Sequence, residues 1–276
     1  MNRKNPDWRK PEGIQAGNWQ YINNHAIAEG YDISLTNSPL VTLDQQLIDS
    51  HLPDRPGVAI DFGCGTGRNA IPLLKKGWDV IGVDLSHPML RQFREKIDGP
   101  REEVQCSGES GDGANRGRAI LVQANLTELS SIDSQTADFG QCMFSTLGMI
   151  QGASYRHQFL RHASRILRGD SILMVHGHNY WHSLRQPGGK RWMVGNFLSA
   201  VRGKCEIGDR FADYRAVQGL MLHHFSLRAL QRELENAGFA IDSTYAILEN
   251  GKATETIGRF DKFNAVGWVV AARNAN

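Results

Sequence analysis

The sequence contains few cysteines and no cysteine pair of the kind that binds zinc or catalyses redox exchange. Four cysteines occur among 276 residues, and none is separated from another by two residues. A zinc ribbon or a disulfide framework needs closely spaced cysteines, so we expect neither, and we assign no metal-binding residues. This low cysteine usage is typical of proteins from a reducing compartment.

Long apolar segments and a strong charge of one sign are also missing. No run of eighteen apolar residues occurs, and the first residues are polar, so we expect a cytoplasmic protein without a membrane partner. Lysine and arginine total 31 against 29 acidic residues, which leaves a net charge of +2. We therefore expect no DNA partner, because DNA-binding domains usually carry a strong basic patch. The 41% of hydrophobic residues suffices for a large core.

What the sequence does contain is a pattern of strand, glycine loop and helix between residues 58 and 76. The segment opens with a short apolar run typical of a buried parallel strand, which ends at Asp61. Glycines then occupy every second position, at Gly63, Gly65 and Gly67, and helical spacing of apolar residues follows. Because glycine lacks a Cβ, a ligand can approach the backbone of such a loop, next to the free N–H groups of the helix.

A second strand pattern follows at residues 78–83 and ends at Asp84. The carboxyl ends of neighbouring parallel strands meet at one edge of a sheet, so we expect Asp84 beside the glycine loop. A carboxylate in that place is suited to accept hydrogen bonds from the two hydroxyls of a ribose. The unit therefore predicts a binding site for a cofactor that contains a nucleoside.

Two cofactor classes are compatible with this unit. Residues 65–70 also fit the dinucleotide fingerprint with alanine in its last position, which would indicate NAD. Asp61, however, would face the pyrophosphate of NAD unfavourably, whereas S-adenosylmethionine carries an ammonium, a sulfonium and no phosphate. The charge of Asp61 thus favours S-adenosylmethionine, and an NAD-dependent oxidoreductase stays as the alternative.

Residues 61–67, Asp-Phe-Gly-Cys-Gly-Thr-Gly, resemble the first motif of the class I S-adenosylmethionine-dependent methyltransferases, an acid followed by alternating glycines. Members of that family usually have an aspartate where this chain has Asn125. The carbonyl oxygen of Asn125 can still accept a hydrogen bond from the adenine amino group. The residues to which the resemblance assigns S-adenosyl-L-methionine binding are Asp61, Gly63, Cys64, Gly65, Thr66, Gly67, Asp84, Leu85, Asn125, Leu126 and Phe144.

The order of predicted strands and helices, read with this resemblance, predicts an α/β fold. We expect a doubly wound, mostly parallel seven-stranded sheet of the Rossmann-like methyltransferase type at residues 57–272, closed by a hairpin-like pair of strands. Within this methyltransferase domain we expect an insertion loop at 98–118. A substrate cap segment is expected at 179–224, after the fifth strand.

An N-terminal helical lead is expected at residues 1–56. Thr42 and Gln45 have the spacing of a capping box, which predicts a helix that opens there and ends near Leu52. In many members of the family such a lead covers the cofactor. Three aromatic residues of the lead could line the cofactor site or belong to the core: Trp19, Tyr21 and Tyr31.

Histidines gather after the fifth predicted strand, at His176, His178 and His182. Two histidines in a His-X-His pattern on a strand point to the same face, but no nearby cysteine or carboxylate completes a metal site, so we interpret them as pocket lining. A general base is needed only if the methyl acceptor is protonated at neutral pH. The catalytic candidates for that role are His178 and His223, each of which could instead be a packed or surface histidine.

The substrate is expected to be a small molecule rather than RNA. Residues 183–224 combine basic and aromatic side chains, a mixture that could hold RNA, but interspersed acids dilute the charge. The aromatics suit a closed pocket around a small molecule. The alternatives are a wobble-uridine tRNA methyltransferase, one of the class I methyltransferases whose late region residues 224–239 resemble, and a non-catalytic cofactor-binding protein.

Overall fold

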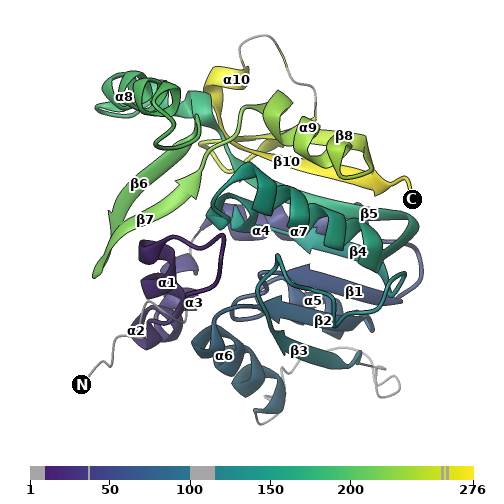
Figure 1. Cartoon of the computed structure of the whole chain (residues 1–276). Coiled ribbons are helices and arrows are strands. Elements are labelled where there is room, and N and C mark those ends of the chain that lie inside the picture. Colours follow the sequence, from purple (N-terminus) through teal and green to yellow (C-terminus); the bar gives the residue numbers. More distant parts are fainter. Residues whose placement is uncertain (1–9, 37, 100–115, 256–257, 259–260) are drawn as a thin grey trace.

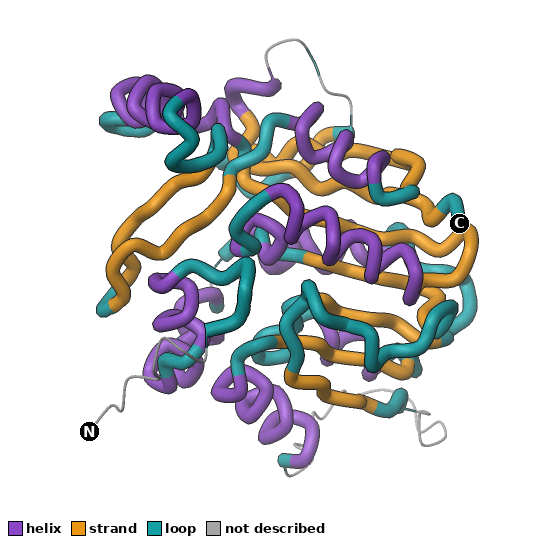
Figure 2. The backbone as a smooth tube through the Cα atoms, in the orientation of Figure 1, coloured by secondary structure: helices purple, strands orange, loops and turns teal. Residues whose placement is uncertain are grey.

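A computed structural model describes residues 10–36, 38–99, 116–255, 258 and 261–276. Its centre is an eight-stranded sheet with the strand order β3-β2-β1-β4-β5-β10-β8-β9 (Figure 1, Figure 2). The strands β1 to β5 pair in parallel, whereas β10, β8 and β9 add antiparallel strands at one side. The strands are β1 (Val58–Phe62), β2 (Asp79–Asp84), β3 (Ala119–Gln123), β4 (Ala137–Cys142), β5 (Leu167–His178), β8 (Phe239–Leu248), β9 (Ala253–Thr254) and β10 (Ala265–Asn274).

The sheet confirms the predicted α/β, mostly parallel architecture, but it has one strand more than the seven expected. The extra strand is β9, a two-residue strand that pairs with the end of β8. It forms because the chain turns back after Leu248, whose backbone N–H donates to the carbonyl of Lys252 at 2.8 Å. The predicted closing pair of strands corresponds to β8 and β10, which run antiparallel side by side.

Helices cover both faces of the sheet, as a doubly wound fold requires. Consecutive residues of β1 point to opposite faces, so Ala59 packs in one buried cluster and Ile60 in the other. The cluster with Ala59 contains α4 (Pro39–Asp49), α5 (Ala70–Lys75) and α6 (His87–Asp98). The cluster with Ile60 contains α7 (Ala153–Ile166) and α9 (Leu227–Asn236).

The remaining elements lie beside the carboxyl ends of the parallel strands (Figure 1). A separate antiparallel hairpin is anchored to α1 by Asn18, whose side chain bonds both the N–H and the carbonyl of Met221 at 2.8 and 2.9 Å. The elements at this end are α1 (Ala16–Ile22), α2 (His25–Glu29), α3 (Tyr31–Leu35), η2 (Thr146–Met149), η3 (Tyr180–Arg185), α8 (Gly189–Val201), the hairpin β6 (Asp209–Tyr214) with β7 (Val217–His223), and α10 (Asp261–Asn264).

The helix α4 begins earlier in the chain than the sequence predicts. The predicted capping box is wrong, because α4 already begins at Pro39, after Ser38, and Thr42 and Gln45 lie inside the helix. Proline is favoured at the first helical position, where its missing N–H costs nothing.

Most of the predicted insertion loop, residues 100–115, lies outside the described residues. In the described ranges, no helix combines the length and the apolar character that crossing a bilayer demands.

Candidate functional site

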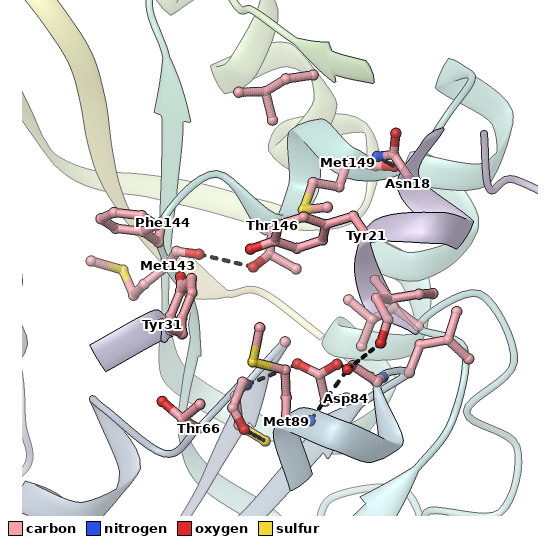
Figure 3. A pocket seen from close by; sticks show the side chains of 18 of the residues that line it. Asn18, Tyr21, Tyr31, Thr66, Asp84, Met89, Met143, Phe144, Thr146 and Met149 are labelled. Atoms are coloured by element: carbon pink, nitrogen blue, oxygen red, sulfur yellow. Dashed lines mark hydrogen bonds between the residues drawn. The ribbon is translucent and has the colours of Figure 1, made fainter. Parts of the chain in front are cut away.

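A cavity of about 380 Å³ opens where the glycine loop, the N-terminal helices and the β6–β7 hairpin meet (Figure 3). Every residue that the sequence assigns to cofactor binding lines this cavity, except Gly67. The lining also includes side chains from outside those motifs, most of them apolar or aromatic. Prominent among them are Tyr21, Tyr31, Arg68, Met89, Met143, Thr146, Met149 and Tyr214.

The three glycines of the loop have left-handed backbone conformations, but they differ in what surrounds the position of a Cβ. A Cβ on Gly63 would lie 2.4 Å from Thr146, and one on Gly67 would lie 2.3 Å from the ring of Phe93. At Gly65 no protein atom lies within 4 Å of the Cβ position, so its surroundings are open. The absence of a side chain therefore allows close packing at Gly67 and leaves room for a ligand at Gly65.

Asp84 lies at the end of β2, where the sequence pattern places it, and its carboxylate holds the loop. Its Oδ2 accepts the N–H of Gly65 at 2.8 Å, and its Oδ1 accepts the N–H of Ser86 at 2.7 Å. Burial raises the pKa of Asp84, whereas these backbone hydrogen bonds oppose that shift. Each carboxylate oxygen has a further lone pair, so Asp84 can accept additional hydrogen bonds from a ligand.

The charges around the cavity leave it acidic. Asp61 is 3% exposed, and burial raises its pKa to about 7. Arg68 is the one lysine or arginine among the described lining residues, and its Nη2 pairs with the buried Asp44 at 3.1 Å. An anionic pyrophosphate would therefore meet Asp61 and Asp84, and Arg68, the one cation among the described lining residues, is already paired, whereas a cationic ligand suits these acids.

The end of β4 is conformationally strained. Phe144 and Ser145 have φ values of 54° and 64°, so two successive residues with side chains adopt the left-handed conformation. The ring of Phe144 lines the cavity, and the guanidinium carbon of Arg68 lies over this ring, 4.7 Å from its centroid. Such strain persists only where surrounding contacts enforce it, and it is concentrated at functional sites.

Asn125 also lies at the cavity, with part of its side chain already engaged. Its Nδ2 donates to the carbonyl of Glu12 at 3.3 Å, and its Oδ1 accepts the N–H of Thr127 at 3.4 Å. A carbonyl oxygen accepts two hydrogen bonds, so the oxygen keeps one lone pair for a ligand.

The N-terminal helices are fastened over the glycine loop by side chains. The hydroxyl of Thr66 donates a hydrogen bond to Oδ1 of Asp32 in α3 at 2.7 Å. The other carboxylate oxygen of Asp32 forms an ion pair with Lys96 at 2.5 Å. Of the three aromatics considered in the lead, two line the cavity: Tyr21 and Tyr31. Burial raises the pKa of Tyr31 to about 12, so its phenol is a neutral hydrogen-bonding group. Trp19 is buried but does not line the cavity.

A second cavity of about 610 Å³ adjoins the first. Four residues line both: His178, Tyr214, Leu220 and Leu222. Burial lowers the pKa of His178 to about 3, so the imidazole is neutral at physiological pH. A neutral imidazole offers one N–H donor and one nitrogen acceptor, which makes His178 a hydrogen-bonding group at the junction.

His223, the other catalytic candidate, lines neither cavity. Its Nδ1 lies 2.7 Å from Asp209, and its ring packs 4.7 Å from that of Phe225. Glu206, Asp209 and His223 place possible ligand atoms within 4.8 Å of one another, but Arg156 already pairs with Glu206 at 2.8 Å. We therefore interpret this group as a buried network of charges rather than as part of the site.

Several residues of the site are not among those predicted from the sequence. Arg68 is engaged by Asp44, twenty-four positions away, and Tyr214 and Leu220 reach the cavity through the folding of the hairpin. The alternation of Leu220 and Leu222 could have indicated a strand with one face toward a pocket. No local pattern identifies the pairing of Arg68 with Asp44.

Comparisons with known proteins agree with this architecture. Residues 60–175 match the family model described as a methyltransferase domain. YqeM, a candidate methyltransferase of Bacillus subtilis strain 168, is 25% identical over 154 residues, which cover 55% of this chain and 54% of YqeM. The ribosomal RNA small subunit methyltransferase C of Alcanivorax borkumensis is 33% identical over 82 residues, covering 29% of this chain and 25% of that protein. The chain thus spans about half or less of these curated relatives.

Solved structures share the fold over most of the chain. A SAM-dependent methyltransferase from Methanosarcina mazei superposes with a TM-score of 0.62 at 19% identity, covering 82% of this chain and 96% of the other. The 1,6-didemethyltoxoflavin-N1-methyltransferase of Burkholderia thailandensis, solved with S-adenosylhomocysteine, gives 0.57 at 17% identity, with 91% and 84% covered. The chain thus contains a segment that matches a methyltransferase domain, and it shares its fold with solved S-adenosylmethionine-dependent methyltransferases.

Proposed function

We propose that this protein transfers a methyl group from S-adenosylmethionine to a small molecule. The observation that carries this proposal is the junction of the two cavities at His178, Tyr214, Leu220 and Leu222. The first cavity offers the features that suit the cofactor, and the second has a volume in the range of small-molecule sites. A donor and an acceptor bound in the two cavities would meet at this junction.

The first cavity fits the cofactor by its own chemistry. Gly65 leaves open space beside the backbone, Asp84 keeps lone pairs for ribose hydroxyls, and Asp61 supplies negative charge for an ammonium. Asn125 and Leu126 would contact the adenine, while Cys64, Thr66, Leu85 and Phe144 complete the walls. Gly63 lines the cavity, and Gly67 supports it only through its close packing against Phe93.

The chemistry asks mainly for positioning. S-adenosylmethionine supplies, when bound, a methyl group that is already activated by the positive charge on sulfur. The protein has to hold a nucleophile in line with that group, and positioning of this kind can contribute on the order of 7–11 kcal/mol. His178 is the residue we propose to orient the acceptor, and its low pKa suits a hydrogen-bond acceptor better than a strong base. We do not extend this role to His223, which lies outside both cavities.

The lead and the cap would enclose the two ligands. We propose that residues 1–56 cover the cofactor through α1 and α3, and that the segment 179–224 shapes the acceptor site through η3 and the β6–β7 hairpin. The contacts of Asn18 with Met221 and of Asp32 with Thr66 support this arrangement, because they join the covering elements to the rim of the cavity.

Calorimetry distinguishes this function from its rivals. We expect S-adenosylhomocysteine to bind and NADH not to bind, since Arg68, the one cation among the described lining residues, already pairs with Asp44. Tight binding of NADH instead would identify a dinucleotide-dependent enzyme. Binding of S-adenosylhomocysteine without turnover on any substrate pool would favour the non-catalytic cofactor-binding protein.

A wobble-uridine tRNA methyltransferase is less well supported. Such an enzyme would need contacts to the phosphates of the tRNA, and the basic residues that could make them are concentrated in the cap segment. One of them, Arg185, donates to Asn264 at 2.6 Å, and α8 exposes apolar residues such as Phe197 between its basic ends. Sub-micromolar, salt-sensitive binding of bulk tRNA would favour the RNA substrate. The residues to replace by alanine as a test are Arg185, Lys190, Arg191, Arg202 and Lys204.

A further inference from the structure

We propose that the second cavity binds an aromatic carboxylate, that Arg210 anchors its carboxylate group, and that this molecule is the methyl acceptor. The inference rests on the proposed function, because it names the class of substrate for that site. It is carried by the contacts of Arg210 and by the polar groups around it.

Arg210 is a half-buried residue of β6 whose guanidinium is held by neutral groups. Its Nη1 donates to Oε1 of Gln186 at 2.5 Å and lies 3.5 Å from Oγ of Ser183. The guanidinium carbon lies 5.4 Å from the centroid of the Trp192 ring. Within the described ranges no carboxylate forms an ion pair with Arg210. The remaining N–H groups are thus available to a carboxylate of a ligand, the partner that guanidinium matches best.

The imidazoles near Arg210 add neutral hydrogen-bonding groups to the same cavity. The Nδ1 atoms of His182 and His224 are buried and have no hydrogen-bond partner. Burial lowers the pKa of both histidines, and the charge of Arg210 lowers it further, so both imidazoles are neutral. Close to the guanidinium, a carboxylate group would pair with Arg210 and accept from imidazole N–H groups, whereas an ammonium group would be repelled at that point.

The acids of the cavity limit the charge of the ligand. Asp213 accepts the N–H of Gly219 at 3.0 Å, and Glu249 is 57% exposed at the rim, 3.9 Å from His182. One arginine and two lining carboxylates suit a single negative charge better than the near-double charge of a phosphate monoester. We therefore assign a carboxylate and not a phosphate.

The walls between Arg210 and the cofactor cavity favour a flat ring. The ring of His178 lies 5.9 Å from that of His176 and 5.5 Å from that of His224, edge to face in both cases. Together with Tyr214 these rings line the cavity up to its junction with the cofactor site. An aromatic ligand anchored at Arg210 can pack against them and extend its other end toward His178.

The methyl transfer needs no reactant besides S-adenosylmethionine and the acceptor. A heteroatom of the acceptor forms the new bond to the methyl carbon while the sulfur–methyl bond breaks. The electron pair of the broken bond stays on sulfur, which leaves S-adenosylhomocysteine. A proton on the acceptor, where there is one, passes to water directly or through the imidazole of His178.

The test uses four ligands on the full chain saturated with S-adenosylhomocysteine, so that only the second cavity is free. The probes are 4-hydroxyphenylacetate, its neutral analogue 4-hydroxyphenethyl alcohol, the amine tyramine, and phenyl phosphate, all measured by ligand-observed NMR titration. We expect 4-hydroxyphenylacetate to bind at least about tenfold more tightly than the other three, as a charge-assisted bidentate contact implies.

Two variants locate the effect. Arg210→Gln should remove the preference for 4-hydroxyphenylacetate while S-adenosylhomocysteine still binds, and Arg202→Gln, an exposed residue at the end of α8, should preserve it. Equal or tighter binding of any other probe would overturn the inference, as would a preference that survives Arg210→Gln, or no binding at millimolar concentration. If S-adenosylhomocysteine itself fails to bind the unmodified chain, the proposed function fails instead.

Discussion

The Oδ2 of Asp84 accepts the backbone N–H of Gly65 at 2.8 Å and so joins the end of β2 to the glycine loop. The contact has two consequences. It holds Gly65 in its left-handed conformation, with open space at its Cβ position. It also turns the carboxylate of Asp84 toward the cavity that both residues line.

Replacing Asp84 by alanine should therefore weaken cofactor binding strongly. Hydrogen bonds to a charged group contribute about 1.5–3 kcal/mol each, so we expect a loss of at least about tenfold in affinity for S-adenosylhomocysteine, measured by calorimetry. The matched control is Asp79→Ala, at the other end of β2, where the carboxylate pairs with Arg118 at the surface. Unchanged affinity in Asp84→Ala would exclude this residue from the cofactor site.

Gly65→Val should abolish cofactor binding and leave the fold intact. A side chain there would project into open space at the cavity, and the left-handed backbone would add a strain of about 1–2 kcal/mol. Gly203→Val is the control, because Gly203 has a φ of +69°, equally open surroundings and a position outside the cavity. Circular dichroism and calorimetry on both variants separate the backbone strain from the loss of the ligand site. Normal binding by Gly65→Val would show that the loop does not contact the cofactor.

Cofactor affinity should fall when the pH drops through neutrality. Burial raises the pKa of Asp61 to about 7, above its ordinary value, so the carboxyl gains a proton below that pH. The ammonium of S-adenosylhomocysteine favours the ionised carboxylate, and the affinity should drop by up to about tenfold per pH unit below about pH 7 and level off above it.

Adenosine, which has no ammonium, is the control ligand for this pH dependence and should show a flat profile. Asp61→Asn should flatten the profile of S-adenosylhomocysteine as well. A pH dependence that is equal for the two ligands would assign the effect to a different group.

The contact between Asp32 and Thr66 should control how firmly the lead closes over the cofactor. Asp32→Ala removes the hydrogen bond to Thr66 and the pair with Lys96, so we expect faster dissociation of S-adenosylhomocysteine in stopped-flow measurements. Exposed pairs contribute about 0.2–1 kcal/mol, which corresponds to an increase of up to about fivefold. Asp98→Ala, on the exposed end of α6, serves as the control. An identical rate in Asp32→Ala would mean that α3 does not close the site.

The parts of the site that local pattern predicts are those in which neighbouring residues act together. The strand before Asp61, the glycine loop and the acid at the end of β2 lie on two consecutive strands, and β1 and β2 pair directly. Their proximity follows from the rule that sequential strands joined by a helix lie parallel and adjacent. For the same reason the mostly parallel sheet with helices on both faces could be predicted from the order of the elements.

The structure departs from the local pattern where a distant partner decides the surroundings of a residue. Gly67 has the spacing of a ligand-binding glycine, but Phe93 of α6 packs where its side chain would be. His223 ends the strand β7 shortly before a helix, and its Nδ1 lies 2.7 Å from Asp209 on the neighbouring strand β6. The strand β9 depends on a turn that brings two residues back to β8, and no local periodicity marks so short a pairing.

The most direct test of the proposed function follows the methyl group. The chain is incubated with methyl-labelled S-adenosylmethionine and with separated pools of small molecules, tRNA and protein from cell extract, beside Gly65→Val as the inactive control. We predict that label enters the small-molecule pool with the unmodified chain alone. Label that appears only in tRNA or protein, or in no pool while S-adenosylhomocysteine binds, would contradict the account.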